Sequence, residues 1–411
     1  MTDRILRVKN IVSRIDELAS ISEDGNNITR RYGTAAAVDA GKKVLEWMRE
    51  AGLTARVDAI GNVRGVLRAG AGDVAAGVKT LVIASHIDTV VNAGRWDGPL
   101  GVVMGLDLVE NIIRNGVKLP FDIELIAFCD EEGVRFHTTY LGSKVVAGSF
   151  EPEMLERRDE GGLRLLEVMN GEAGALAEDA IRPGKWLGYF EIHIEQGPVL
   201  YERNIPVAVV KAIAGQVRVE IVFCGMAGHA GTVPMEMRQD ALCGAAEFVL
   251  AVEEMAGMAG SGLVATVGKL QIKDAASNVI PGEVVCSLDL RSADEVVLSQ
   301  GHERLRKLCL EIGLRRRLET RWNVVQLSSP VICDGRMKEL LGVCVGAEGY
   351  AVLELVSGAG HDAVPVSAVS PVCMLFVRCF KGISHNPLED VEEKDLEAAL
   401  AVAEKFIQSI V

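Results

Sequence analysis

The sequence has no uninterrupted apolar run of the roughly 18 residues that a membrane span requires, so we predict no membrane partner. Basic residues are also few, with 43 Lys and Arg against 57 Asp and Glu and a formal net charge of -14. Because nucleic-acid binding needs clustered basic side chains that displace counterions, we predict no nucleic-acid partner. The amino-terminal segment is charged and amphipathic and lacks the apolar core of a secretory signal, so we expect a cytoplasmic protein.

Cysteine never occurs as a CxxC pair, although the chain contains nine cysteines. Their number is odd, and Cys129, Cys373 and Cys379 lie inside apolar runs. Buried free thiols in a reducing compartment therefore fit the sequence better than a disulfide framework.

The chain of 411 residues exceeds the size at which single hydrophobic cores usually stop growing, so two domains are expected. In the first half, apolar strand patterns alternate with helical patterns, which is typical of a layered α/β sheet. The predicted elements are strands over Thr80–Ser85, Ile123–Phe128 and Tyr189–Ile194 and helices over Tyr32–Ala51 and about Leu100–Asn115.

The pattern changes at about Ala212, where apolar residues begin to alternate with polar ones, as expected of half-exposed strands. With helical patterns at Asp240–Met255 and Asp294–Ile312, the region 212–328 is predicted to form a small α+β sandwich. The apolar strand Pro371–Val377 and a helix from Glu389 to the end are expected to return to the first sheet. The first domain would then combine residues 1–211 and 329–411.

Histidine is scarce, with seven residues, and six of them lie beside predicted strands or glycine-rich turns. His86 ends the first of these strands, and Asp88 shares its face, where the carboxylate could orient the imidazole. Asp97 stands in the turn GRWDGPLG, from which a carboxylate can bridge two cations. Taken singly, each of these residues is more often a hydrogen-bonded structural group than a ligand.

The next strand ends in AFCDEEGVRF, where three successive acids repel one another unless a cation lies among them. A pair of metal ions would remove this repulsion, with Glu132 as a ligand and Glu131 as general base and later acid. A solvated acidic loop would be the better interpretation if this feature stood alone.

Two further histidines complete the constellation. His193 is flanked at a spacing of two by Glu191 and Glu195, so a strand would place all three side chains on one face. His385 follows the predicted strand Pro371–Val377, and ligands in open α/β sheets collect at the carboxyl ends of strands. Imidazole and carboxylate ligands suit Zn²⁺, Mn²⁺, Co²⁺ or Ni²⁺, and the sequence does not choose among them.

The segments SHIDTV, WDGPLG, DEEG, HIEQGPVL, GHAGTVPM, SNVIPG, SGAGHD and GISHNP resemble, in order, those of the M20 metallo-amidohydrolases, in the branch of allantoate amidohydrolases and N-carbamoyl-L-amino-acid hydrolases. The resemblance implies an α/β fold in which an aminopeptidase-like di-metal catalytic domain with a mixed sheet carries an inserted lid that forms a homodimer. Asp97 would bridge two divalent ions, Mn²⁺ or Zn²⁺ before Co²⁺ or Ni²⁺, and Glu131 would move protons. The resemblance implies five metal ligands, namely His86, Asp97, Glu132, His193 and His385.

The same resemblance assigns roles to residues of the lid. His229 of GHAGTVP would reach from the partner subunit to stabilise the oxyanion, and the plain alternative is a loop histidine. Arg291 and Asn278 would clamp the substrate carboxylate, although Arg291 also fits a surface salt bridge. Gln216 would contact the substrate through its amide. Two further residues, Gln196 and His361, lie in matching segments without an assigned role.

The function expected from this resemblance is hydrolysis of a ureido bond in a small substrate that carries a carboxylate. Allantoate, which would yield ureidoglycine, ammonia and carbon dioxide, is the first expectation, and an N-carbamoyl-L-amino acid is the alternative. A catalytically inactive metabolite-binding protein is a third possibility, against which the intact set of ligands and base argues.

Overall fold

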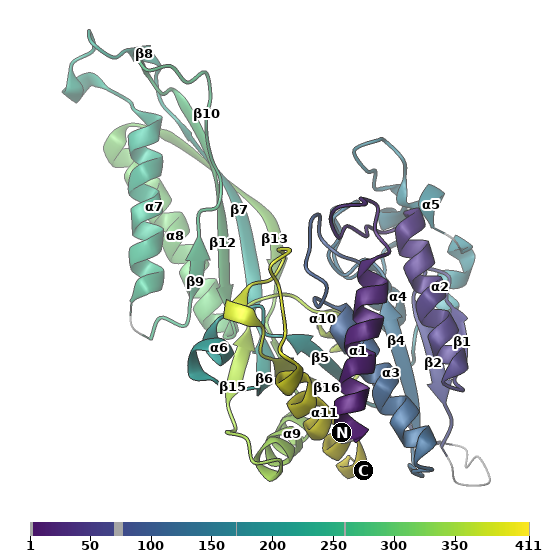
Figure 1. Ribbon diagram of the computed structural model, residues 1–411. Helices are drawn as coiled ribbons and strands as arrows, with labels where there is room; N and C mark the ends of the chain where they lie inside the picture. Colours follow the sequence, from purple (N-terminus) through teal and green to yellow (C-terminus); the bar gives the residue numbers. More distant parts are fainter. Residues whose placement is uncertain (1–2, 70–76, 170, 259, 411) are drawn as a thin grey trace. The chain divides into compact units, whose positions relative to one another are not determined.

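The computed structural model describes residues 3–69, 77–169, 171–258 and 260–410, and the chain forms two compact units (Figure 1). The first unit combines Met1–Lys211 with Cys333–Val411, and the second is Ala212–Ile332. The boundary expected at 328 coincides with the end of strand β13 (Glu319–Ser328), whereas the second unit continues through β14 (Val331–Ile332).

The first unit alternates strands and helices. Its elements before the second unit are α1 (Asp3–Ala19), α2 (Ala35–Glu50), β1 (Thr54–Val57), β2 (Val63–Leu67), β3 (Thr80–His86), α3 (Pro99–Arg114), β4 (Asp122–Phe128), α4 (Leu141–Ala147), η1 (Pro152–Glu156), α5 (Leu165–Val168), η2 (Ala173–Glu178), β5 (Trp186–Ile194), α6 (Val199–Arg203) and β6 (Val207–Ile213). The elements after it are α9 (Gly335–Ala347), β15 (Glu354–Ser357), α10 (Ala363–Val366), β16 (Val372–Val377), η4 (Phe380–Gly382) and α11 (Glu393–Ser409).

Within the described residues, one sheet has nine strands in the order β1-β2-β4-β3-β5-β16-β6-β14, with β15 paired to β6. The four central strands β4, β3, β5 and β16 run parallel, and the pairs on either side of them are antiparallel. Every residue of β4 and β16 is buried, as expected when helices cover both faces of parallel strands. This mixed α/β architecture confirms the predicted fold class, and it brings the carboxyl ends of four strands to one edge.

Helices cover both faces of this sheet (Figure 1). The helices α1, α2, α3, α9 and α11 pack on one face and share a large apolar core with the strands. A smaller apolar cluster that includes Phe136, Leu141 and Val145 lies around α4 and α5. The chain enters α3 through Gly98, whose φ of 83° suits glycine, and Pro99 occupies the first turn, where its missing N–H costs nothing.

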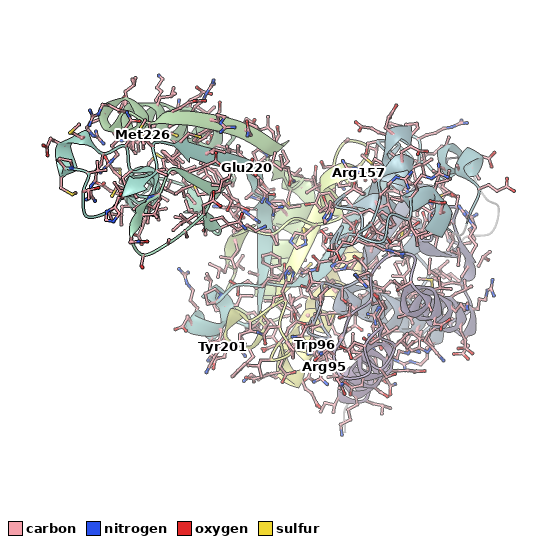
Figure 2. All side chains as sticks on the ribbon, turned by 90° about the horizontal axis from the view of Figure 1, so that it is seen from above. Arg95, Trp96, Arg157, Tyr201, Glu220 and Met226 are labelled. Atoms are coloured by element: carbon pink, nitrogen blue, oxygen red, sulfur yellow. The ribbon has the colours of Figure 1, made fainter. Side chains whose placement is uncertain are left out.

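The second unit is an α+β sandwich. Its further elements are β7 (Gly215–Cys224), β8 (Gly228–His229), η3 (Met235–Met237), α7 (Ala241–Gly257), β9 (Val264–Thr266), β10 (Leu270–Ile272), β11 (Val279–Ile280), β12 (Glu283–Ser292) and α8 (Glu295–Arg316). Strands β10, β12, β7 and β13 form a sheet in that order, with β9 also paired to β12. Alternate residues of β7 and β12 are buried beneath α7 and α8. Met226, which follows β7, lies at the surface of this unit (Figure 2).

One element differs from the sequence prediction. The last helix begins at Glu393 and not at Glu389, because Phe380 N–H donates to the carbonyl of Asp390 and the buried Glu389 carboxylate binds another loop. The described residues of the acidic segment 151–184 form a long connection that contains the short elements η1, α5 and η2. No described helix is long and apolar enough to cross a membrane.

Candidate metal centre

Four parallel strands deliver the candidate ligands. His86 is the last residue of β3, and His193 lies one residue before the end of β5. Glu132 follows β4 and His385 follows β16, so these side chains meet beyond the carboxyl ends of neighbouring strands. The sheet therefore explains how residues far apart in sequence reach one site.

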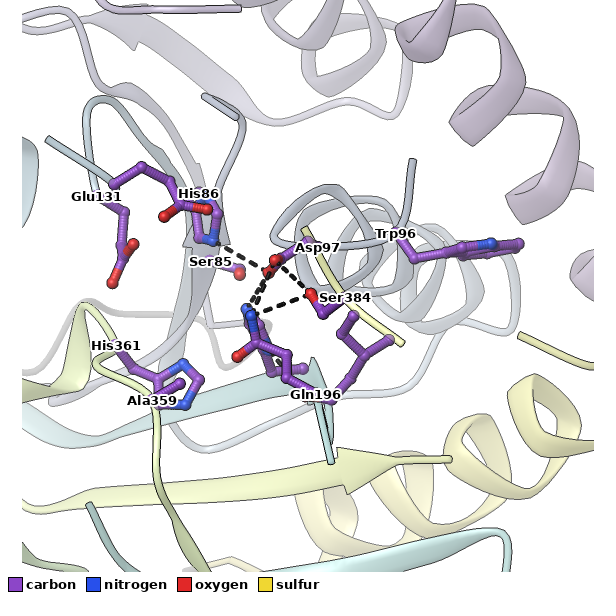
Figure 3. A network of polar contacts seen from close by, with 12 residues as sticks. Ser85, His86, Trp96, Asp97, Glu131, Gln196, Ala359, His361 and Ser384 are labelled. Carbon is purple, nitrogen blue, oxygen red and sulfur yellow. Dashed lines mark hydrogen bonds and ion pairs between the residues drawn. The ribbon is translucent and has the colours of Figure 1, made fainter. Parts of the chain in front are cut away.

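Asp97 lies at the middle of this site (Figure 3). Its Oδ1 is 3.2 Å from His193 Nε2 and 3.8 Å from His86 Nε2. Its Oδ2 is 3.1 Å from His385 Nε2, which in turn lies 3.4 Å from Glu132 Oε1. The Asp97 carboxylate thus faces two groups of potential metal ligands, one through each of its oxygens.

The donor atoms fall into two sets that share Asp97. His86, Asp97 and His193 place one ligand atom each within 4.8 Å of one another, and so do Asp97, Glu132 and His385. Asp97 Oδ1 and His193 Nε2 are buried and, although close, have no hydrogen bond of acceptable geometry. Buried polar atoms are normally satisfied, so these two fit a ligand role. The residues present fit two divalent cations bound by imidazole and carboxylate.

Backbone carbonyls orient two of the imidazoles. His86 Nδ1 lies 3.1 Å from the carbonyl oxygen of Asp88, and His193 Nδ1 lies 2.9 Å from that of Ile194. A carbonyl acceptor keeps the proton on Nδ1 and leaves Nε2 for a metal. The carboxylate of Asp88 lies 3.6 Å from the same His86 Nδ1 through Oδ1, and it also accepts hydrogen bonds from the backbone N–H groups of Glu131 (3.0 Å) and Glu132 (3.1 Å). Asp88 therefore orients the acidic loop with its side chain and the imidazole with its carbonyl.

The loops at the site adopt uncommon backbone conformations. Asp130, Gln196 and His385 have φ values of 54°, 56° and 54°, in the left-handed region that side chains other than glycine rarely adopt. Such conformations persist where surrounding contacts hold them, and they concentrate at functional sites. Gly98 also lacks space for a side chain, because a Cβ there would overlap the ring of His86.

The acids and imidazoles shift one another's proton affinities. Hydrogen bonds to Asp97 and Glu132 raise the pKa of His385 to about 10. Burial raises the pKa of Asp97, but its contacts with His193 and His385 outweigh burial and hold this pKa well below the ordinary value. Burial raises the pKa of Glu131 well above its usual range, and the neighbouring Glu132 adds to this while His86 opposes it. Glu131 is thus a buried carboxyl group suited to exchanging a proton.

The face-sharing prediction around His193 was half right. Glu191 lies beside His193 and His361, and these three also place ligand atoms within 4.8 Å of one another. Glu195 turns away, because β5 ends at Ile194 and the Glu195 carboxylate accepts the N–H groups of Val199 and Leu200 at the start of α6. The spacing of Glu191, His193 and Glu195 does not show that the Glu195 side chain turns away beyond the end of the strand.

Gln196 and His361, the two residues to which the family resemblance assigned no role, lie at the candidate metal centre. Gln196 Nε2 donates to Asp97 Oδ2 at 2.8 Å. His361 is buried, meets His193 edge to face at 4.6 Å and lies 2.7 Å from Ser357 Oγ. Burial and the nearby His193 hold the pKa of His361 well below its usual value, so this imidazole is neutral.

Sequence reasoning missed Glu389 and Ser384. Glu389 accepts the backbone N–H groups of Trp96 and Asp97, and burial together with the charge of Asp97 raises its pKa to about 7. Ser384 donates to Asp97 Oδ2 at 2.8 Å. The only sequence signal was their position beside His385 in GISHNPLED.

The lid residues named from sequence lie in the second unit and form two pairs. Gln216 and Arg291 are register partners on β7 and β12, and both bind the carboxylate of Asp289. Arg218 donates to the same carboxylate.

His229 lies in the separate two-stranded pairing of β8 with β11, opposite Val279. The carbonyl of Asn278 accepts the N–H of Ala230 beside it. The second unit thus brings Gln216 to Arg291 and Asn278 to His229, on different sheets.

Comparison with known proteins identifies the family of this chain. The sequence profile of peptidase family M20/M25/M40 matches residues 82–409. The chain belongs to the M20 peptidase family. This M20 protein is 36% identical to allantoate deiminase 1 of Glycine max, with 97% of this chain and 89% of that relative covered. It is equally 36% identical to an N-carbamoyl-L-amino acid amidohydrolase of Geobacillus stearothermophilus, with 95% of each chain covered.

A solved structure shares the whole fold with this M20 protein. The crystal structure of an amidase of the hydantoinase/carbamoylase family from Burkholderia multivorans matches it with a TM-score of 0.91 and 33% identity, covering 98% of this chain and 97% of the other. The predicted family resemblance is therefore confirmed.

Proposed function

We propose that this M20 protein is a metal-dependent amidohydrolase that cleaves a ureido C–N bond, with allantoate as its substrate. The proposal rests on the position of Asp97. Its two carboxylate oxygens face two groups of potential metal ligands, beside the buried Glu131. The similarity to an allantoate deiminase over 97% of the chain supports this choice of substrate.

The metal-binding part of the proposal rests on the donor atoms. His86 and His193 would hold one ion, Glu132 and His385 the other, and Asp97 both. Two divalent ions there would supply Lewis acidity to the substrate carbonyl and to water. Mn²⁺ and Zn²⁺ are the first choices for these ligands.

Glu131 carries the proton transfer in this mechanism. It accepts the proton of the attacking water at its carboxylate and delivers it to the departing nitrogen. Its burial favours the neutral acid, which makes the second transfer possible, and the neighbouring His86 favours the anion needed for the first.

The second unit would bind the substrate and complete the site. We assign His229 to stabilising the oxyanion from the partner subunit in a homodimer, and Gln216, Asn278 and Arg291 to holding the substrate. A partner surface for dimerisation is offered by β13, the last strand in its sheet order, where Val325 and Leu327 are each 70% exposed.

An N-carbamoyl-L-amino acid is the second candidate substrate, because the Geobacillus relative is as similar as the plant one. Such a compound has the same ureido carbonyl and a carboxylate for Arg291. Residues of the second unit would then decide between the two substrates.

The test is ammonia release by protein stripped with a chelator and reloaded with Mn²⁺ or Zn²⁺. We expect turnover of allantoate to exceed that of N-carbamoyl-L-amino acids and to depend on added metal, with Glu131→Gln as the inactive control. Preference for the carbamoyl amino acids would reverse the assignment of substrate. Absence of ammonia from both, in protein shown to hold metal, would contradict the proposed reaction.

A further inference from the structure

Glu389 joins the two loops that carry Asp97 and His385. Its side chain is buried, with the residue 4% exposed, and its Oε1 accepts two backbone hydrogen bonds, from Trp96 N–H at 2.7 Å and from Asp97 N–H at 3.0 Å. One carboxylate oxygen therefore fixes the peptide that carries the shared ligand.

The other oxygen of Glu389 continues this arrangement. Ser384 Oγ lies 3.1 Å from Glu389 Oε2 and 2.8 Å from Asp97 Oδ2. Asp97 is thus held at its backbone by Glu389 and at its carboxylate by a serine that Glu389 contacts.

The opposite loop is shaped to admit this side chain. A Cβ at Gly94 would overlap the Cβ, Cδ and Oε1 of Glu389, so a side chain at position 94 and the present position of Glu389 are incompatible. Glu389 itself belongs to none of the groups of potential ligand atoms found among the described residues. Its contacts are those of a residue that holds a ligand in place without being one.

We propose that Glu389 is a positioning residue for the metal centre, which sets metal affinity by fixing the backbone of Asp97. The inference rests on the metal site of the proposed function. Asp97 must direct Oδ1 to His86 and His193 and Oδ2 to Glu132 and His385 at the same time, which leaves little tolerance for displacement of its backbone. Partners that orient ligands in this way typically contribute about 10–100-fold to metal affinity.

Asp390 offers a matched control. It joins the same two loops, but through side chains: its Oδ1 accepts Trp96 Nε1–H at 3.2 Å and Arg95 Nη2–H at 3.1 Å. The Arg95 guanidinium also lies over the Trp96 ring, 5.1 Å from its centroid. Among the described residues, the Asp390 carboxylate accepts hydrogen bonds from the side chains of Arg95 and Trp96 and none from the backbone of Asp97, and this side chain is 56% exposed.

The experiment measures metal binding directly. The full-length protein is stripped with a chelator, and Mn²⁺ is titrated calorimetrically into the original protein and into Glu389→Ala, Glu389→Gln and Asp390→Ala. We expect Glu389→Ala to weaken binding by about 10–100-fold. Glu389→Gln keeps an acceptor oxygen at the same reach and should stay within a few-fold of the original affinity, and Asp390→Ala should match the original.

Thermal unfolding of the metal-free variants separates positioning from general support. A merely structural role would lower the unfolding midpoint of Glu389→Ala while the folded protein kept its metal affinity. If Glu389→Ala does not fold, Gly94→Ala serves as the second variant, because its Cβ displaces Glu389 without removing any polar group. It should weaken Mn²⁺ binding in the same way.

The possible results separate this inference from the function on which it rests. Unchanged affinity in folded Glu389→Ala or Gly94→Ala would overturn the positioning role and leave the metal site standing. An equal loss in Glu389→Gln would assign the effect to charge, and an equal loss in Asp390→Ala would assign it to loop attachment in general; either result overturns the inference. Failure of the original protein to bind Mn²⁺ or Zn²⁺ would instead remove the proposed metal centre itself.

Discussion

In the first unit, His86, His193 and His361 are each at most 2% exposed and lie among buried carboxylates, whereas His229 of the second unit is exposed on a short strand. His302, the other histidine of the second unit, accepts a hydrogen bond from Trp322 Nε1 at 3.1 Å and belongs to none of the groups of potential metal ligands among the described residues. Buried ionisable groups are costly unless paired or bound to a cation. The first unit therefore has the surroundings expected of a metal site, and His229 and His302 of the second unit lack them.

Glu131, the proposed acid–base residue of the first unit, should give the largest effect. We expect Glu131→Gln to lower kcat by about 10²–10⁴-fold, the usual contribution of a general acid–base, while metal content stays near that of the original protein. Steady-state kinetics and metal analysis of the same preparation test this. Loss of metal in the variant would indicate that Glu131 is itself a metal ligand, and would contradict its assignment as a base that does not bind metal.

The exposed histidine of the second unit should come next. We expect His229→Ala to keep its metals and lose about 10²–10³-fold in kcat, the cost of removing one oxyanion donor. Mixing it with Glu131→Gln subunits tests the action across a dimer, because a mixed dimer would contain one site with both groups intact. Verified mixed dimers that regain no activity would place the action of His229 in its own subunit or make it structural.

Metal binding to the first unit should depend on pH. The pKa of His385 in the metal-free protein is raised to about 10, so at neutral pH the imidazole holds a proton that a metal must displace. Affinity should rise with pH, by up to about tenfold per unit for one released proton, and level off above pH 10. The charged imidazole stabilises the metal-free fold most at pH below its unfolded pKa, and this contribution is lost as pH rises through about 10.

Calorimetry in two buffers of different ionisation enthalpy counts the released protons. Binding at pH 7.5 without proton release would contradict the raised pKa of His385. A protein without a metal site would show no binding at all. An error in the pKa of His385 can therefore be told apart from the absence of a metal site.

Helix caps should give the smallest effects and should separate the units. Asp294 accepts the N–H groups of Val296 and Val297 at the start of α8, and Asp334 accepts that of Met337 at the start of α9. We expect either Asp→Ala change to cost about 1 kcal/mol of stability, in its own unit. Amide hydrogen exchange locates the loss, and Asp294→Ala should leave Mn²⁺ affinity unchanged. A weaker affinity would show that the second unit supports the metal centre.

Buried strands were predictable because continuous apolar runs leave little freedom in placing them. The expected strands Thr80–Ser85 and Pro371–Val377 differ by one residue from β3 (Thr80–His86) and β16 (Val372–Val377). Four of the five candidate ligands lie at or just beyond the ends of predicted strands, and the carboxyl ends of parallel strands share an edge, so the strand pattern predicted that these four lie close together. Asp97 was expected in a turn, and the resemblance to the M20 enzymes assigned it to the same site.

Residues whose roles depend on a neighbouring loop were not predictable. Glu389 follows Pro and Leu and precedes an acidic run, so its pattern favours a helix start, but its contacts with the backbone of Trp96 and Asp97 override that preference. Glu195 was misplaced although the predicted strand already ended at Ile194, because a residue beyond the strand need not follow its alternation; the Glu195 carboxylate binds the N–H groups of Val199 and Leu200 instead. The shared binding of Asp289 to Arg291, Gln216 and Arg218 likewise depends on strand register that the sequence alone does not reveal.

The strand order also limits when the sheet can form during synthesis of the chain. β16 lies between β5 and β6, although it is synthesised only after the whole second unit has left the ribosome. Until then, β5 and β6 each lack a neighbour, and unpaired strand edges favour association with other chains. A nascent chain that stops before Val377 therefore lacks both the complete strand that joins β5 to β6 and His385, the last of the five proposed ligands in the sequence. The proposed metal centre would thus be completed only at the end of folding. Truncated chains should be identifiable because β5 and β6 keep unpaired edges and because the chains do not retain metal.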